Sequence, residues 1–221
     1  GIGTLIFDKA NTYTGNTTVS AGTLAVNDSL ANTPTTVTSA TSARLQGSGL
    51  IFGPVTIGNN GTLAAGNSIE SLGMGALVLD PGSTFEQEIT GETNAGADLV
   101  YSSGNLSFSG TVTLNLINTG SRVWQPMDKI TLISYSGSLT LNSGFSYADG
   151  NNGLLADGET FDFAGTQWVF DYDDTSPGTN YASDATSVGV TPSFVTMTVA
   201  VPEAGTAGLA ALGLLLLRRL R

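Results

Sequence analysis

A short apolar step recurs about every twenty residues along the first half of this chain. It reads Gly-Thr-Leu at residues 3–5 and again at 22–24 and 61–63, with looser copies between and after these. Self-similarity at a fixed period of this size is the sequence signature of repeat architectures, so the period constrains the fold before any element is assigned. The apolar members of the steps are Leu5, Leu24, Leu45, Leu63, Phe85 and Leu106, at spacings of 19, 21, 18, 22 and 21 residues.

A second short strand is expected ahead of most of these steps, as at 17–19, 35–37 and 54–57. Each unit then holds two strands and a turn, which is too little to close a core, so successive units must stack. Glycine and asparagine at 47–49 and 59–61 suit the positive φ of sharp corners. The sequence predicts an all-β fold, a right-handed parallel β-helix, with an antiparallel sandwich as the alternative.

The repeat divides the chain into three expected parts. Residues 1–120 form the β-solenoid, and residues 121–200, where the period fades, form an irregular β-rich cap over its open end. Residues 201–221 form a separate tail. The first residue is Gly1 rather than methionine, which favours the C-terminal portion of a longer protein. Within the cap, strands are expected at 129–141, 160–172 and 194–201.

Composition excludes several kinds of chemistry. The 221 residues include no histidine and no cysteine, which removes the usual general base, the Ser-His and Cys-His nucleophile pairs, thiol catalysis and disulfides. Acidic residues outnumber basic ones by 18 to 7, and a net charge of −11 repels nucleic acid. We therefore expect no cofactor, no nucleic-acid partner and a function that is not enzymatic.

Glu86 and Glu88 carry the enzymatic alternative. They lie two residues apart on an expected strand, so their side chains project from one face about 6.6 to 7 Å apart, a separation compatible with a glycosidase pair. The basic residues that such sites use for acidic sugars are scattered along the sequence. A solvated acidic face is the simpler interpretation, and a polysaccharide-degrading β-helix stays the alternative.

An acidic cluster near the end of the cap is a candidate cation site. Asp171, Asp173 and Asp174 can supply oxygen ligands to calcium. They lack the spacing of an EF-hand loop, so an acidic, hydrated loop after a strand is the prediction, with a calcium site as the alternative and no metal site expected.

Large aromatic side chains share one face of the expected strand at 160–172. They form either a sugar-stacking platform or part of the core of the cap, and inward packing is the prediction because alternating aromatic residues usually point inward. These residues are Trp168, Phe170 and Tyr172.

The first repeat has a more specific pattern. Asn-Thr-Tyr-Thr-Gly at 11–15 is followed by Thr-Thr-Val at 17–19 and Gly-Thr-Leu at 22–24. This segment resembles the autotransporter-associated β-strand repeat, also called the passenger-associated transport repeat, and weaker similarity continues to about residue 140. The resemblance implies a β-helical extracellular passenger with a scaffold or adhesive role, and it brings no catalytic residues.

An apolar run of fourteen residues, 204–217, precedes the last four residues of the chain. As a helix it spans about 21 Å, against about 30 Å for the hydrocarbon core, and flanking arginines can close part of the gap. We expect an apolar transmembrane helix with its basic end in the cytoplasm. The cytoplasmic anchor residues are Arg218, Arg219 and Arg221.

The tail as a whole, a Pro-Glu motif followed by an apolar helix and arginines, resembles the PEP-CTERM sorting tail of Gram-negative bacteria that make exopolysaccharide. The resemblance implies that an exosortase cuts near the motif, although Ala204 stands where the family usually has a second proline. A plain C-terminal membrane anchor is the alternative. The sorting motif consists of Val201, Pro202 and Glu203.

Together these features predict an exported structural or adhesive protein of the cell surface or extracellular matrix, anchored at first in the inner membrane. The expected partners are the exosortase-type enzyme, the membrane before processing, and exopolysaccharide or surface matrix bound along a flank rich in Thr, Ser and Asn. A fragment of an autotransporter-type passenger is the alternative.

Overall fold

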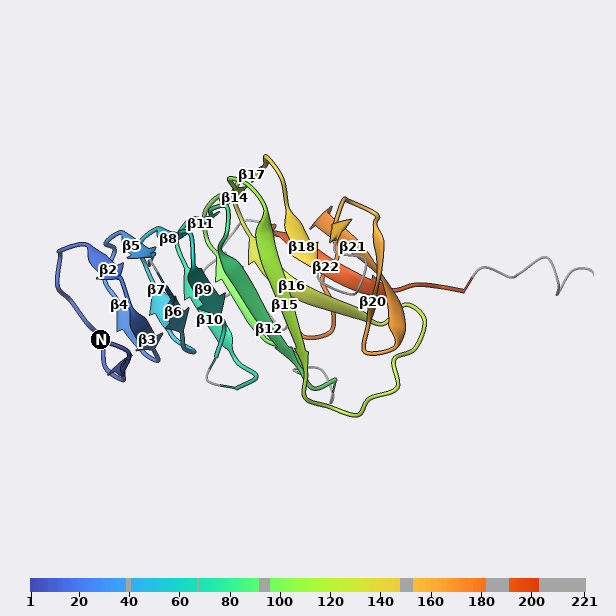
Figure 1. The fold of residues 1–221 in the computed structure, drawn as a ribbon, viewed down its shortest axis with the longest axis horizontal. Helices are drawn as coiled ribbons and strands as arrows, with labels where there is room; N and C mark the ends of the chain where they lie inside the picture. The colour runs from blue at the N-terminus through green and yellow to red at the C-terminus, as the bar shows by residue number, and fades with distance from the viewer. Residues whose placement is uncertain (39–40, 67, 92–95, 148–152, 182–190, 203–221) are drawn as a thin grey trace, which may run out of the picture.

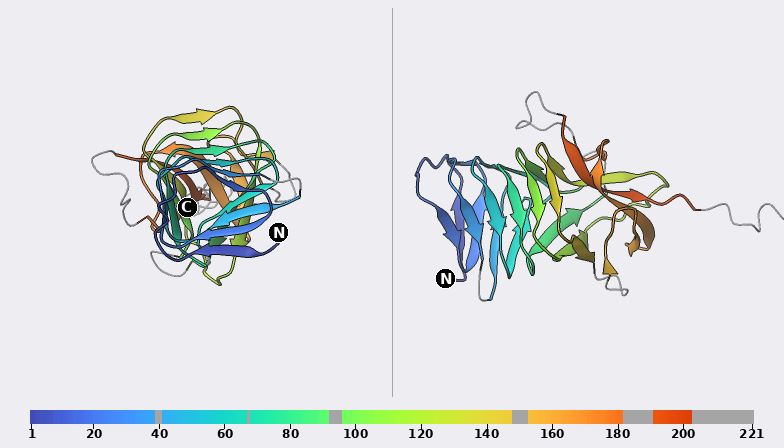
Figure 2. Two further views of the ribbon diagram at one scale, coloured as in Figure 1. Left: turned by 90° about the vertical axis from the view of Figure 1, so that its left-hand side faces the viewer. Right: turned by 90° about the horizontal axis from the view of Figure 1, so that it is seen from above.

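The computed structural model describes residues 1–38, 41–66, 68–91, 96–147, 153–181 and 191–202. Within these ranges the fold is all-β, and its strands form three long sheets that wrap around one apolar core (Figure 1). Seen end on and from above, the sheets form a stack of coils that is closed at its C-terminal end by a smaller group of strands (Figure 2). For this part of the chain, the predicted all-β fold with parallel, solenoid-type stacking is confirmed.

The first sheet, sheet A, begins at the N-terminal end of the stack. Its strands pair in parallel up to β18, and the last pair is antiparallel. In order across the sheet they are β1 (Thr4–Phe7), β3 (Gly22–Val26), β6 (Ala43–Gln46), β9 (Gly61–Ala64), β12 (Thr84–Ile89), β15 (Val112–Asn118), β18 (Phe145–Tyr147) and β19 (Gly153–Leu154).

Sheet B and sheet C form the other two faces of the stack. Sheet C consists of β2 (Thr17–Val19), β5 (Thr35–Val37), β8 (Val55–Ile57), β11 (Leu77–Leu79), β14 (Leu106–Phe108) and β17 (Leu139–Leu141). Sheet B consists of β4 (Ser29–Leu30), β7 (Leu50–Ile51), β10 (Ser71–Met74), β13 (Leu99–Ser102), β16 (Lys129–Tyr135), β22 (Ser193–Val199), β21 (Thr166–Asp174) and β20 (Thr160–Phe163).

Each coil contains three strands, not the two that the sequence predicts. The chain visits sheets C, A and B in turn, and the strands on sheet B are only two residues long in the first coils. A two-residue strand such as β4 has too few residues to show an alternating pattern, so it escapes sequence inspection. Parallel pairing between coils also rules out the antiparallel sandwich for this region.

The register confirms the stacking of most of the repeat. Leu5, Leu24, Leu45, Leu63 and Phe85 pair in succession across sheet A. Assigning Leu106 to the next place in this column is wrong. That place belongs to Leu114, whereas Leu106 lies on β14 of sheet C and pairs with Leu77 and Leu139. The coil is longer here because β12 has six residues and a segment follows it before β13.

Parallel stacking continues past residue 120, where the sequence period fades. β16, β17 and β18 still pair in parallel with β13, β14 and β15 of the coil before them. On the other edge of β16 the pairing becomes antiparallel, and β22, β21 and β20 extend sheet B over the end of the core. The strands predicted at 129–141, 160–172 and 194–201 are all present.

Corners between strands use the backbone conformations that the sequence predicts. Asn60 has a φ of 58° and Gly47 a φ of 126°. A Cβ at Gly47 would collide with the backbone carbonyl of Val26 in the coil below, so glycine is required there by contact as well as by conformation.

The apolar helix predicted at 204–217 lies outside the described residues. Among the residues that the structure does describe, no helix has the length and apolar character needed to cross a membrane.

Candidate functional site

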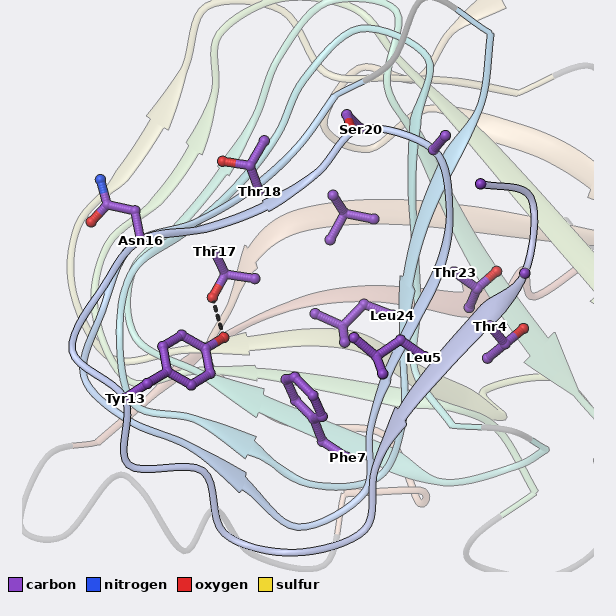
Figure 3. Close-up of a pocket in the computed structure, with 14 residues that line it drawn as sticks. Thr4, Leu5, Phe7, Tyr13, Asn16, Thr17, Thr18, Ser20, Thr23 and Leu24 are labelled. Atoms are coloured by element: carbon purple, nitrogen blue, oxygen red, sulfur yellow. Dashed lines mark hydrogen bonds between the residues drawn. The ribbon is translucent and has the colours of Figure 1, made fainter.

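The N-terminal end of the stack presents its apolar cross-section to solvent. Leu5 is 58% exposed and Ile6 is 52% exposed, although their partners in the next coil are buried. A cavity of about 600 Å³ lies between β1 and the turn that precedes β2, and Phe7, Tyr13 and Leu24 line its apolar side (Figure 3). This end therefore combines apolar side chains with the unpaired edge of β1.

The outer face of sheet A carries a column of hydroxyl-bearing side chains. Strand pairing places one such residue in most coils, at the spacing of about 4.8 Å between neighbouring strands. This arrangement confirms that the flank predicted to be rich in Thr, Ser and Asn faces outward. The column consists of Thr4, Thr23, Thr62, Thr84 and Thr113, and Arg44 takes the place between Thr23 and Thr62.

Arg44 and Glu86 are brought together on this face by the stacking of coils. The two side chains form an ion pair, and Asn115 Nδ2 donates a hydrogen bond of 3.0 Å to the other oxygen of the same carboxylate. A basic residue far away in the sequence thus reaches the predicted carboxylate pair of Glu86 and Glu88. Both oxygens of Glu86 thus have partners on other coils, which ties the wall of the solenoid together at this point.

Asp98 joins this cluster and was missed by the sequence analysis. It is 1% exposed, and its carboxylate accepts hydrogen bonds from the backbone N–H groups of Glu70 (3.1 Å) and Glu88 (3.0 Å). Burial raises the pKa of Asp98 to about 7, with smaller contributions from the charges of Glu88 and Glu86. The only sequence signal was an aspartate placed directly before the apolar strand β13.

A cavity of about 60 Å³ lies among Arg44, Glu86, Glu88 and Asp98. It has about one tenth of the volume of the cavity at the N-terminal end. The cluster is a small, largely buried polar seam in the wall of the solenoid.

Three aspartates converge at the edge of the cap. Asp157, Asp171 and Asp173 each offer a carboxylate oxygen, and these oxygens all lie within 4.8 Å of one another. Burial and the neighbouring carboxylates raise the pKa of Asp171. Oxygen ligands at such distances suit a hard cation such as calcium. Of the three aspartates predicted for such a site, the structure brings only Asp171 and Asp173 together, with Asp157 as a neighbour that the sequence analysis missed.

Asp174 does not lie with the other two aspartates of the candidate cluster. β21 alternates its side chains between two faces, which places Asp174 beside Lys129 instead. Thr196 Oγ1 donates a hydrogen bond of 2.9 Å to the same carboxylate. Although burial acts in the opposite direction, the hydrogen bonds from Lys129, Ser176 and Thr196 lower the pKa of Asp174.

The aromatic strand forms the core of the cap, as predicted. Trp168, Phe170 and Tyr172 are all at most 2% exposed, which excludes a sugar-stacking platform. Tyr172 also ties the cap to the last coil, because its hydroxyl accepts a hydrogen bond from the N–H of Phe145 (2.6 Å) and donates one to the carbonyl of Leu155 (3.0 Å).

Only part of the predicted sorting tail can be placed. Val201 and Pro202 follow β22 as exposed residues outside any strand. The remaining residues of the sorting and anchoring prediction lie outside the described residues. They are Glu203, Ala204, Arg218, Arg219 and Arg221.

A comparison with protein families matches residues 1–26 to the model of the passenger-associated transport repeat. The matched segment covers β1, β2 and β3, the first complete pairing between coils. No curated protein matches the chain. The chain is thus similar to this repeat at its N-terminal end.

Proposed function

We propose that this protein is an exported β-solenoid scaffold of the cell surface or extracellular matrix. The observation that carries the proposal is the stack of parallel coils itself, with its continuous apolar core and its outward column of threonines. Backbone hydrogen bonds between coils make such a stack stiff, and its long flank suits weak, repeated contacts with a polymer.

The match of residues 1–26 to the passenger-associated transport repeat supports export. Passengers of autotransporters are displayed outside Gram-negative cells, and the parallel β-fold agrees with that class. A passenger-type fragment is therefore the closest alternative to a matrix protein, and both place the solenoid outside the cell.

The tail supports initial anchoring in the inner membrane followed by exosortase processing. This step rests on the sequence of residues 201–221, with its Pro-Glu motif, apolar run and arginines. An uncleaved membrane anchor is the competing outcome. We propose a structural rather than a catalytic role for Glu86, since Arg44 and Asn115 tie its carboxylate to other coils within the wall of the solenoid.

Mass spectrometry of the native protein tests the sorting step. The mature C-terminus is determined separately in the membrane and extracellular fractions. A terminus near Pro202 in the extracellular form supports sorting and release. Intact Arg221 found only in membranes rejects processing and leaves a tethered stalk.

Binding to exopolysaccharide tests the scaffold role. The double variant Thr62→Val and Thr84→Val removes two hydroxyls from the outer column but keeps the β-branched shape that the strands favour. We expect weaker retention on immobilised exopolysaccharide with an unchanged melting temperature. Equal retention of the variant and the parent protein would reject the threonine column as the binding flank.

A further inference from the structure

Three large apolar side chains are exposed where the chain leaves the cap. Val123 is 78% exposed, Met127 70% and Val201 60%, and we call these three residues the exit patch. The loop between β15 and β16, which carries the first two, runs beside the end from which residues 200–202 depart (Figures 1 and 2). Hydrogen bonds fix this arrangement, since the N–H of Met127 donates to the carbonyl of Val199 (3.1 Å).

The loop that presents the exit patch is held rigidly. The Arg122 guanidinium lies 4.9 Å from the centre of the Trp124 ring and pairs with Asp128 at 2.8 Å. Trp124 in turn packs edge-on against the buried Trp168 with ring centres 4.9 Å apart. The exposed apolar side chains are therefore displayed on a fixed surface.

Met127 adopts a backbone conformation that suits a different residue. Its φ of 75° lies in the left-handed region, which costs a residue with a Cβ about 1 kcal/mol or more, and which glycine and asparagine tolerate better. The loop thus combines backbone strain with the exposure of a large apolar side chain. Neither feature stabilises the isolated domain, which points to a contact outside it.

The sequence after the exit patch identifies the occupant. Ala204 begins the apolar run of fourteen residues, and the three residues from Val201 to Ala204 span at most about 11 Å. A tail inserted in a bilayer therefore brings the patch to the membrane interface. Arg122 and Asp128 neutralise each other beside it, so the loop does not share the strong negative charge of the body.

We propose that Val123, Met127 and Val201 form a membrane-contact patch that seats the capped end of the solenoid on the bilayer holding its tail. The stack then stands at a defined angle to the membrane instead of swinging on a flexible tether. This inference rests on the membrane anchoring proposed above and adds a contact made by the folded body.

The chain contains no cysteine, so a single introduced thiol can report the contact. Val123→Cys in the full chain is labelled with an environment-sensitive fluorophore and reconstituted into phosphatidylcholine vesicles. Thr18→Cys, exposed on β2 at the far end of the stack, is the matched control. Flotation of the vesicles measures insertion of the tail independently of the fluorescence.

We expect both labelled proteins to float with the vesicles, and only the label at position 123 to show a severalfold rise in emission. Adding Met127→Asn should reduce that rise without lowering the melting temperature, because asparagine accepts the positive φ. Flotation with no difference between positions 123 and 18, or a rise unaffected by Met127→Asn, overturns the contact. Failure to float overturns the proposed anchoring and the contact with it.

Discussion

The first coil and the capped end of the stack differ in how their apolar surface is covered. Every coil has an apolar cross-section, and at the N-terminal end it meets solvent, with Leu5 and Ile6 more than half exposed. At the other end an antiparallel excursion of sheet B places the rings of Phe170 and Tyr172 against Phe145 of the last coil. At the cap, a change of strand direction covers the apolar cross-section that a parallel coil leaves exposed.

Charge follows the same division. Residues 1–60 contain two acidic and two basic residues, so their net charge is zero, whereas residues 153–200 contain seven acidic residues and no basic one. Successive coils contact one another through uncharged, apolar surface, whereas charged side chains usually face water. The N-terminal end thus has the character of a contact between coils, and the cap that of an outer surface.

Truncating one apolar side chain at each end should give the largest difference. Phe145→Ala removes a fully buried ring that contacts Phe108 and Phe85 at 4.8 and 5.4 Å between ring centres, and we expect a loss of about 4 kcal/mol in the free energy of unfolding. Leu5→Ala should cost less than about 1 kcal/mol, because Leu5 is already half in water. Urea unfolding measures both, and equal losses would contradict the assignment of an open and a closed end.

The closed end was only partly predictable from the sequence. Alternating aromatic residues at 168–172 predict an inward-facing strand, and the strand is there. The sequence period, by contrast, suggested Leu106 as the next member of the sheet A column because its spacing of 21 residues fits by coincidence. The length of a coil changes where extra residues stand between two strands, as between β12 and β13, and such residues do not repeat along the sequence.

The polar features depended on contacts between distant coils. Arg44 and Glu86 are 42 residues apart, and only stacking brings them together. In the sequence, Asp98 is only a polar residue directly before a strand. Its burial depends on Glu70 and Glu88, whose backbone N–H groups reach it only after the coils have stacked. Asp157 was missed for the same reason. It precedes β20 in the sequence, and only the antiparallel pairing of β20 with β21 brings it close to Asp171.

Removing one hydroxyl at each end sharpens the comparison. Tyr172→Phe leaves the buried N–H of Phe145 and the carbonyl of Leu155 without this partner, and we expect a loss of about 2 kcal/mol. Tyr13→Phe at the open end breaks an exposed hydrogen bond to Thr17 and should change stability by less than about 0.5 kcal/mol. Thermal unfolding of the two variants compares them directly, and a larger effect at Tyr13 would reverse the interpretation.

The stability of the protein should depend on pH through Asp98. Asn180 Nδ2 donates to the backbone carbonyls of Asp98 and Thr131, which ties the segment after β21 to the wall beside the Asp98 carboxyl. Because the pKa of Asp98 is raised from 3.8 to about 7, the folded protein holds a proton there that the unfolded chain releases between these values. Stability therefore falls as pH rises from about 4 to about 7, by about 2 kcal/mol after allowance for solvent screening.

Asp98→Asn separates this effect from the repulsion among the many other carboxylates. Asparagine cannot titrate, so the slope of unfolding free energy between pH 4 and 7 should become shallower by the contribution of Asp98. The variant also loses one acceptor for a backbone N–H, which lowers stability at every pH in this range alike. An unchanged slope would show that the Asp98 carboxyl is ionised throughout this range in the folded protein.

The smallest effect is expected at the acidic edge of the cap. Asp171→Asn keeps the acceptor for the N–H of Asp173 but removes a charge that burial and neighbouring carboxylates disfavour, so stability at neutral pH should rise by about 0.5 kcal/mol or less. Since the pKa of Asp171 is raised, the gain should disappear on acidification, when the wild-type carboxyl is protonated too. The exposed Asp28, near the open end, gives the matched variant Asp28→Asn, which makes the same change in net charge. Equal gains from the two variants in thermal unfolding would trace the effect to the net charge of −11 and not to the crowding of carboxylates at the closed end.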